Sequence, residues 1–272
     1  MIKGWTAEAM NTAPDSQNQI HGDDIARKYG FKGGLVPGVT ISAYLIQPAV
    51  DSWGMDWLER GAAHVRVSSP LYDGEQFTVN ITQEFKDHYK AELARPDGTV
   101  SATADISLTG PVETAGTPPV RRMDQIAEKD FIGPKASFET FKQLKQEGCL
   151  AFRYRWGSKH RMNAYIENQA LMPELLRLDG GGYANMSFIL GCSNWVLASN
   201  AQMNPWVHLE TRSQNFRAVP ADTRIIAEMD IDNFYEKKGH EFIDVNVNLF
   251  DEANDDCLAV IALRAIYKLR GM

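Results

Sequence analysis

The first hundred residues carry the alternation of apolar and polar positions that is typical of a sheet with one buried face. Three segments show it, at residues 77–82, 100–108 and, more briefly, 65–67. The tetrapeptide PDGT at 96–99 has the composition of a tight turn between two strands. We therefore predict an antiparallel sheet in this part of the chain.

The same order of elements returns in the second part of the chain. Residues 225–232 and 243–249 alternate between apolar and polar, and residues 258–269 are apolar on both faces, as in a central strand. In both parts a stretch that is apolar around most of its circumference precedes these strands, at residues 38–50 and 182–198. Such a stretch indicates a helix enclosed by protein.

Internal duplication accounts for this repeated order. The two helical stretches begin 144 residues apart, and the same offset separates His64 from His208. We predict an α+β fold of two antiparallel sheets, each wrapped around its long buried helix and joined at edges that would otherwise be open. A stretch rich in Gly, Pro and Thr predicts a linker at 113–120, between units at 1–112 and 121–272. Two unrelated α+β domains are the alternative.

The composition is that of a soluble globular protein without a strongly charged partner. The 272-residue chain is 44% hydrophobic and 23% charged, with a formal net charge of −7. Nucleic acids and anionic membranes favour basic surfaces, so neither is an expected partner. The longest apolar-rich segment, 35–50, is too short and too broken by proline and glycine to span a bilayer. Three cysteines without metal spacing, and the lack of a signal-peptide pattern, favour the cytoplasm.

The segment from Asp15 to Tyr44 carries the residues best suited to chemistry. It reads DSQNQIHGDDIARKYGFKGGLVPGVTISAY, with His21 ahead of a short amphipathic helix predicted at 23–29. Glycines then lead the chain into the long helix at Gly38. The backbone N–H groups of Gly38 and Val39 could bind the carbonyl oxygen of a ligand at the helix start, and His21 could move a proton or activate water.

This segment resembles the signature of the MaoC-like hydratases, a family with the hotdog fold. That signature is an Asp, then Asn-Pro-x-His, then a short helix and the glycine that opens the long helix; Asn18 and His21 match its Asn and His. The family's Asp lies two residues before the Asn, where this chain has Ser16, with Asp15 one residue earlier. The resemblance implies a double hotdog that catalyses (R)-specific enoyl hydration or 3-hydroxyacyl dehydration. His21 would act with Asp15 or Ser16, and Asn18 would hold water or substrate.

The resemblance also implies how the substrate is carried. The acyl thioester would arrive on coenzyme A or on a phosphopantetheine arm, with no metal or further cofactor. The second unit has no histidine in the corresponding region, and the offset of 144 places Tyr165 where the first unit has His21. The second unit is therefore expected to shape the acyl pocket. A homodimer of the fused pair is left open.

Two other functions fit the same scaffold. A thioesterase would use the same N–H groups and would need a carboxylate or a water-orienting group, for which Asp24 is the nearby candidate. Asp24 also suits the first turn of the short helix. A protein that binds acyl ligands without turnover is the third hypothesis. The other histidines are expected at partly exposed strand starts (His64 and His208), in polar turns (His88 and His240), or in a solvated loop that could hold a phosphate (His160).

Overall fold

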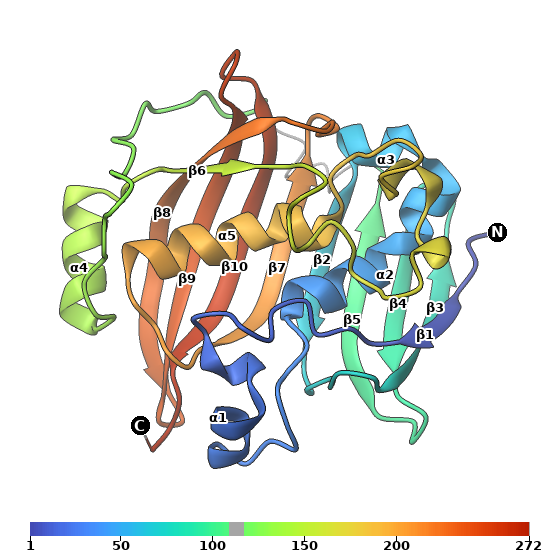
Figure 1. The fold of residues 1–272 in the computed structure, drawn as a ribbon, viewed down its shortest axis with the longest axis horizontal. Helices are drawn as coiled ribbons and strands as arrows, with labels where there is room; N and C mark the ends of the chain where they lie inside the picture. Colours follow the sequence, from blue (N-terminus) through green and yellow to red (C-terminus); the bar gives the residue numbers. More distant parts are fainter. Residues whose placement is uncertain (109–116, 272) are drawn as a thin grey trace.

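The computed structural model describes residues 1–108 and 117–271, and within them ten strands form one antiparallel sheet (Figure 1). In chain order the strands are β1 (Trp5–Glu8), β2 (Ala62–Val67), β3 (Gln76–Glu84), β4 (His88–Ala94), β5 (Val100–Ser107), β6 (Phe152–Arg155), β7 (Val207–Asn215), β8 (Arg224–Lys237), β9 (His240–Asp251) and β10 (Cys257–Lys268). The α-helices are α1 (Asp23–Lys28), α2 (Gly38–Trp53), α3 (Met55–Arg60), α4 (Phe138–Glu147) and α5 (Met186–Asn200). The short 3-10 helices are η1 (Gln19–His21), η2 (Gln169–Leu171) and η3 (Glu174–Leu176).

The order of the strands shows that the chain is built from two equivalent halves. Across the sheet the order is β1-β3-β4-β5-β2 and then β7-β10-β9-β8-β6, so both halves have the same connectivity. They meet where β2 pairs antiparallel with β7, from Ala62 opposite Gln214 to Arg66 opposite Glu210. The two predicted sheets are thus joined, at the edges where joining was expected, into one continuous sheet of ten strands, because each half uses its open edge to pair with the other.

The two long helices lie on the same face of this sheet, next to each other (Figure 1). Residues 38–50 of α2 are all buried, as the apolar circumference predicted. The hydroxyl groups of Thr40 and Ser187, from the first turns of α2 and α5, are 2.9 Å apart. The core is thus shared between the halves.

Helix α5 begins later than predicted. The prediction placed its start at 182, but the side chain of Asn185 accepts a hydrogen bond from the N–H of Phe188 at 3.1 Å and caps the helix. The helix therefore begins at Met186. Measured from Gly38 to Met186, the helices are offset by 148 residues, not by 144.

The alternating segments are confirmed as strands β2, β3, β5, β8, β9 and β10. The prediction missed β1, β4 and β6, whereas the strand expected to start near His208 is present as β7. Strands β1 and β6 have four residues each and lie at the two outer edges of the sheet. Strand β4 reads HYKAELA, which is rich in helix formers, although Tyr89, Ala91 and Leu93 alternate into the core. His88 and His240, expected in polar turns, are the first residues of β4 and β9.

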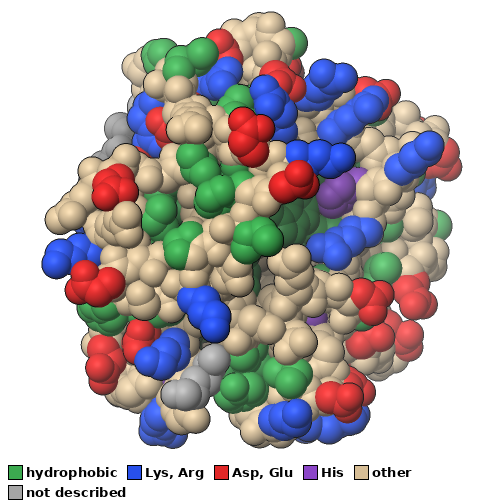
Figure 2. Space-filling view, turned by 60° about the vertical axis from the view of Figure 1, so that its left-hand side comes forward, with side chains coloured by type: hydrophobic (Ala, Val, Ile, Leu, Met, Phe, Trp, Pro, Cys, Tyr) green, Lys and Arg blue, Asp and Glu red, His purple; other side chains and the backbone are tan. Residues whose placement is uncertain are grey.

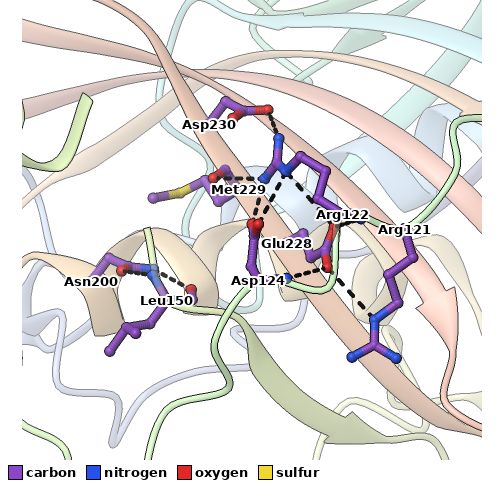
Figure 3. Close-up of polar contacts among 8 residues, drawn as sticks. All are labelled: Arg121, Arg122, Asp124, Leu150, Asn200, Glu228, Met229 and Asp230. Atoms are coloured by element: carbon purple, nitrogen blue, oxygen red, sulfur yellow. Dashed lines mark hydrogen bonds and ion pairs between the residues drawn. The ribbon is translucent and has the colours of Figure 1, made fainter. Parts of the chain in front are cut away.

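The chain that enters the second half closes over the sheet at Glu228 of β8 (Figure 3). Alternation placed Glu228 among the solvent-facing residues, but it is fully buried. Its carboxylate accepts hydrogen bonds from the N–H groups of Arg122 (2.9 Å) and Asp124 (3.1 Å). The guanidinium of Arg121 lies 3.6 Å away. The buried charge is thus compensated, and it holds residues 121–124 against the sheet.

The division into units is only partly covered by the structure. Residues 113–116 of the predicted linker lie outside the described residues. The boundaries of the units at 1–112 and 121–272 therefore stay a prediction.

The surface carries charges of both signs. On the face shown in Figure 2, Lys and Arg side chains lie among Asp and Glu, with apolar side chains between them. Within residues 1–108 and 117–271, no helix has both the length and the apolar character needed to cross a membrane.

Replacing Glu228 with alanine should destabilise the fold by about 3 kcal/mol, because two backbone donors and the Arg121 guanidinium would lose a buried partner. The free energy of unfolding in urea measures the effect. Asp230→Ala is the matched control, since Asp230 is on the same strand and pairs with Arg122 but is exposed. It should cost less than about 1 kcal/mol. Equal losses in the two variants would contradict this account.

Candidate active site

A pocket of about 160 Å³ opens where the two halves of the sheet meet. It is bounded by the motif segment before α1, by the first turns of α2, and by the chain leaving β2 and entering β7. Among the described residues that line it, none is a carboxylate. Its polar side chains are those of Asn18, His21, Ser68, Ser69, Asn194 and His208.

His21 lies in this pocket with one ring nitrogen already bound. Its Nδ1 is 2.7 Å from the carbonyl oxygen of Leu35, which can only accept, so Nδ1 carries the proton. Nε2 therefore carries the acceptor lone pair of the ring, and the side-chain N–H of Asn18 donates to it over a long 3.4 Å. Burial lowers the pKa of His21 below 6.5, and the Leu35 hydrogen bond opposes this in part. The neutral, basic imidazole is thus the predominant form at pH 7.

Asn18 ties the motif segment to the second half of the chain. Its Nδ2 donates to the carbonyl oxygen of Trp206 at 3.0 Å, and its Oδ1 accepts from the N–H of Trp206 at 3.1 Å. The backbone N–H of Gln19 donates to Oδ1 of Asn204 at 2.9 Å. These bonds fix the segment before His21 against the chain that enters β7.

Two local constraints hold the motif segment in place. Asp23, in the first turn of α1, accepts a hydrogen bond from the N–H of Gly34 at 2.9 Å and closes the loop that carries α1. A side chain at Gly34 would lie 2.2 Å from the carbonyl oxygen of His21, so this close approach requires glycine. Ala26, on the predicted inner face of α1, is fully buried in a small apolar cluster with Leu269.

The two carboxylates and the serine hydroxyl predicted for the site do not line the pocket. Asp15 and Asp24 are exposed. The hydroxyl of Ser16 donates to the carbonyl oxygen of Asn18 at 3.0 Å. The structure thus brings Asn18 and His21 together without a carboxylate between them, because Asp15 belongs to the exposed turn that precedes the motif.

The predicted oxyanion residues lie at the start of α2. Gly38 lines the pocket, and Val39 follows it as a buried residue. The helical hydrogen bonds begin with Thr40 and Ile41, whose N–H groups donate to the carbonyl oxygen of Pro37. The N–H groups of Gly38 and Val39 precede those bonds and have no partner within their helix. Their position suits a carbonyl oxygen that gains negative charge.

The second half keeps the shape of the motif without its histidine. Helices η1 and η2 each follow an asparagine, in the tetrapeptides NQIH at 18–21 and NQAL at 168–171. By this alignment of the tetrapeptides Leu171 stands where the first half has His21, whereas the offset of 144 predicted Tyr165. Both residues contact Gln47 of α2, through the Tyr165 hydroxyl and the Leu171 carbonyl, and neither is a histidine.

His208, expected as a partly exposed strand residue, is the second imidazole of the pocket and is 7% exposed. Strand β10 pairs with Glu210 and then with His208, so Leu209 is an extra residue in β7. This β-bulge turns His208 toward the helices. A Cβ on Gly38 would lie 2.5 Å from Cδ2 of His208, so the ring occupies room that the glycine leaves. The Nδ1 of His208 is 3.1 Å from Oδ1 of Asn194.

Of two other histidines outside the pocket, one agrees with the prediction and one differs. His64 is the expected partly exposed residue near a strand start; its strand pairs with β5 without a bulge, and its Nε2 is 2.5 Å from Oε1 of Glu210. His160 was expected in a solvated loop, but its ring packs against Phe188, with ring centroids 4.8 Å apart. Neither lines the pocket.

Comparison with known proteins places the fold. No family profile matches the sequence, and no curated protein matches it. A conserved hypothetical protein of Mycobacterium tuberculosis with a double hotdog fold has a TM-score of 0.56 at 8% identity, and the match covers 98% of this chain and 96% of that one. A Thermobifida fusca protein described provisionally as thioesterase II has a TM-score of 0.54 at 10% identity, with 98% and 92% covered. The tesB protein of Mycobacterium avium subspecies paratuberculosis has a TM-score of 0.50 at 9% identity, with 98% and 93% covered.

At these identities the likeness concerns the fold alone. The chain has the hotdog fold, repeated twice within one sheet. Membership of the MaoC-like hydratases stays a prediction.

The buried histidines should make stability fall in acid. Burial and, to a smaller extent, the nearby His21 together lower the pKa of His208 to about 3. An unfolded histidine has a pKa near 6.5, so below that pH the unfolded chain binds a proton that folded His208 does not. Between pH 7 and pH 5 this linkage should remove about 2 kcal/mol of unfolding free energy. Urea titrations at both pH values should show a loss smaller by that amount in His208→Gln, and parallel pH profiles would refute the assignment.

Proposed function

We propose that this chain is a hotdog thioesterase that hydrolyses acyl thioesters in the pocket at the junction of its halves. The observation that carries the proposal is the unprotonated Nε2 of His21, which lines the same pocket as the first residue of α2. A general base and a set of N–H donors are the two groups that thioester hydrolysis requires. Structures that share the fold include proteins described provisionally as thioesterases.

The proposed reaction proceeds in two steps. The carbonyl oxygen of the thioester binds at the N–H groups of Gly38 and Val39, where the helix start stabilises negative charge. His21 Nε2 takes a proton from water as the water oxygen bonds to the carbonyl carbon. The C–S bond then breaks, and the proton passes from His21 to the departing sulfur. Water and thioester are thus converted to a carboxylic acid and a thiol.

The lack of a carboxylate favours hydrolysis over hydration. In the hydratase signature an Asp stands beside the Asn and His, and this chain has Ser16 at that place, with its hydroxyl bound to a backbone carbonyl. Among the described lining residues, the groups that can accept a proton from water are imidazoles. Hydrolysis needs a base to take the proton from water and N–H groups to bind the carbonyl oxygen. Water then attacks the carbonyl carbon, which is bonded directly to that oxygen.

The substrate is proposed from the lining of the pocket. Apolar side chains such as Phe31, Ile41 and Trp206 line it, and they suit an acyl group. The acyl group would be carried on coenzyme A or on a phosphopantetheine arm, and no further cofactor would take part. A homodimer of the fused pair stays a prediction.

Hydration of enoyl thioesters is the second candidate function. It is favoured by the contact between Asn18 and His21, the two residues that match the hydratase signature, at 3.4 Å. In that case His21 would act with Asn18-bound water on the β-carbon of the enoyl group.

Release of free thiol from a series of acyl-CoAs tests the proposal. His21→Ala should lower kcat/KM roughly 10²- to 10⁴-fold, the usual contribution of a general base. His64→Ala is the matched control, because His64 is also a partly buried histidine but lies outside the pocket; the activity of this variant should equal that of the unaltered protein.

Three outcomes would contradict the proposal. Unchanged hydrolysis in His21→Ala would remove His21 from the reaction. Loss of enoyl absorbance from 2-enoyl-CoA, dependent on His21 and without thiol release, would establish hydration instead. A rise in melting temperature with acyl-CoA, without any turnover, would establish a binding protein.

A further inference from the structure

His208 has a buried polar atom that the proposed function does not yet use. The residue is 7% exposed, it lines the pocket, and its Nε2 has no hydrogen-bond partner among the described residues. An unpaired buried acceptor costs about 1–3 kcal/mol, so such atoms in native proteins normally bind water or a ligand. The pocket, at about 160 Å³, has ample room for a water molecule.

The hydrogen bond to Asn194 determines what the free nitrogen can do. Nδ1 of His208 lies 3.1 Å from the side-chain oxygen of Asn194, so Nδ1 carries the proton and Nε2 can only accept. His21 is fixed in the same tautomer by the carbonyl of Leu35. Both imidazoles therefore present an acceptor nitrogen: Nε2 of His208 has no partner among the described residues, and Nε2 of His21 has the long contact with Asn18 at 3.4 Å. A molecule with two hydrogens to donate suits both nitrogens.

The chain makes two local adjustments that place His208 there. The extra residue Leu209 in β7 turns the ring from the outer face of the sheet to the face that carries the helices. Gly38 leaves the room that the ring fills, since a Cβ would come within 2.5 Å of it. In the first half β2 has no bulge against β5, and His64 pairs with Glu210 instead. The first half therefore has no inward-turned histidine that corresponds to His208.

We propose that His21 and His208 together hold the nucleophilic water, which donates one O–H to each Nε2. This inference rests on the proposed thioesterase function and adds a catalytic residue from the second half of the chain. The side-chain N–H of Asn18, 3.4 Å from Nε2 of His21, lies beside the same atom and suits the water oxygen as a third partner. With both hydrogens engaged, one lone pair of the water faces the thioester carbon.

The two imidazoles take different parts in the reaction. The water proton that faces His21 moves to its Nε2 as the oxygen bonds to the carbonyl carbon, and it leaves on the sulfur when the C–S bond breaks. His208 keeps its hydrogen bond and gains no proton, because it is the more deeply buried base and lies against the start of α2, where positive charge is unfavourable. His208 orients the water and His21 is the base.

Two variants separate the role of Nε2 from the role of the ring in packing. His208→Asn retains an N–H donor for Asn194 and removes the Nε2 acceptor; His208→Gln places an amide group where Nε2 stood. We expect kcat to fall about 10²-fold in His208→Asn with KM changed less than about threefold, because water is misplaced while acyl binding persists. His208→Gln should recover part of the rate. Equal kcat in His208→Asn and the unaltered protein, or a loss in KM alone, would overturn the proposal.

A crystal structure of the full chain without ligand tests the water directly, whatever the enzyme's activity. We expect one ordered water within about 3.2 Å of both Nε2 atoms, and its loss in His208→Asn. A water bound to His21 but not to His208 would overturn the inference even if thioesters are hydrolysed. A bridging water in a protein that hydrolyses no thioester would leave the two-imidazole water site standing and would end the proposed function.

Discussion

The pairing of β2 with β7 is the interaction on which both the fold and the pocket depend. Each half of the chain would otherwise present the unpaired N–H and C=O groups of a sheet edge. Because the two strands are antiparallel, the last residues of β2 lie next to the first residues of β7, at the same end of the strand pair. The pocket opens there, and its lining comes from both halves. Closing the sheet and forming the pocket are thus one structural event.

Duplication supplied two similar halves, and small local changes made them different at the pocket. In the first half the motif retains His21, whereas the corresponding tetrapeptide of the second half ends in Leu171. In the second half a bulge at Leu209 brings His208 inward, whereas the unbulged β2 leaves His64 with Glu210 on the other face. Each half therefore contributes one imidazole, from a different element of the repeated unit. The pocket is asymmetric although the scaffold around it is nearly symmetric.

Local patterns in the sequence predicted those parts of the fold whose causes are local. The long helices, six of the strands and the short helix after His21 follow from periodicity, and the structure contains them. The burial of Glu228 and the inward turn of His208 depend on chain segments that are distant in sequence. Glu228 is buried because residues 121–124 cover it. The alternation of apolar and polar residues along β8 does not indicate that another segment packs over this position.

The candidate site was predictable to the same extent. Asn18, His21 and Gly38 were found because their spacing is local and resembles a known signature, and all three line the pocket. His208 was missed because a bulge is defined by the pairing of two strands, here β7 with β10. The constant offset of 144 concealed the correspondence of NQIH with NQAL, since it assumed loops of equal length in both halves.

The electrostatics of the pocket favour a reaction in which His21 is protonated only transiently. Two neutral imidazoles are far less costly to bury than a carboxylate, so the pocket can remain apolar enough for an acyl group. Burial lowers the pKa of His21, which makes its protonated form a stronger acid than an ordinary imidazolium. A proton taken from water is therefore readily passed to a thiolate, whose conjugate acid has a pKa near 8.5. The step with the higher energetic cost is the attack of water on the carbonyl carbon. The N–H groups at the start of α2 lie where they can stabilise the oxyanion that this attack creates.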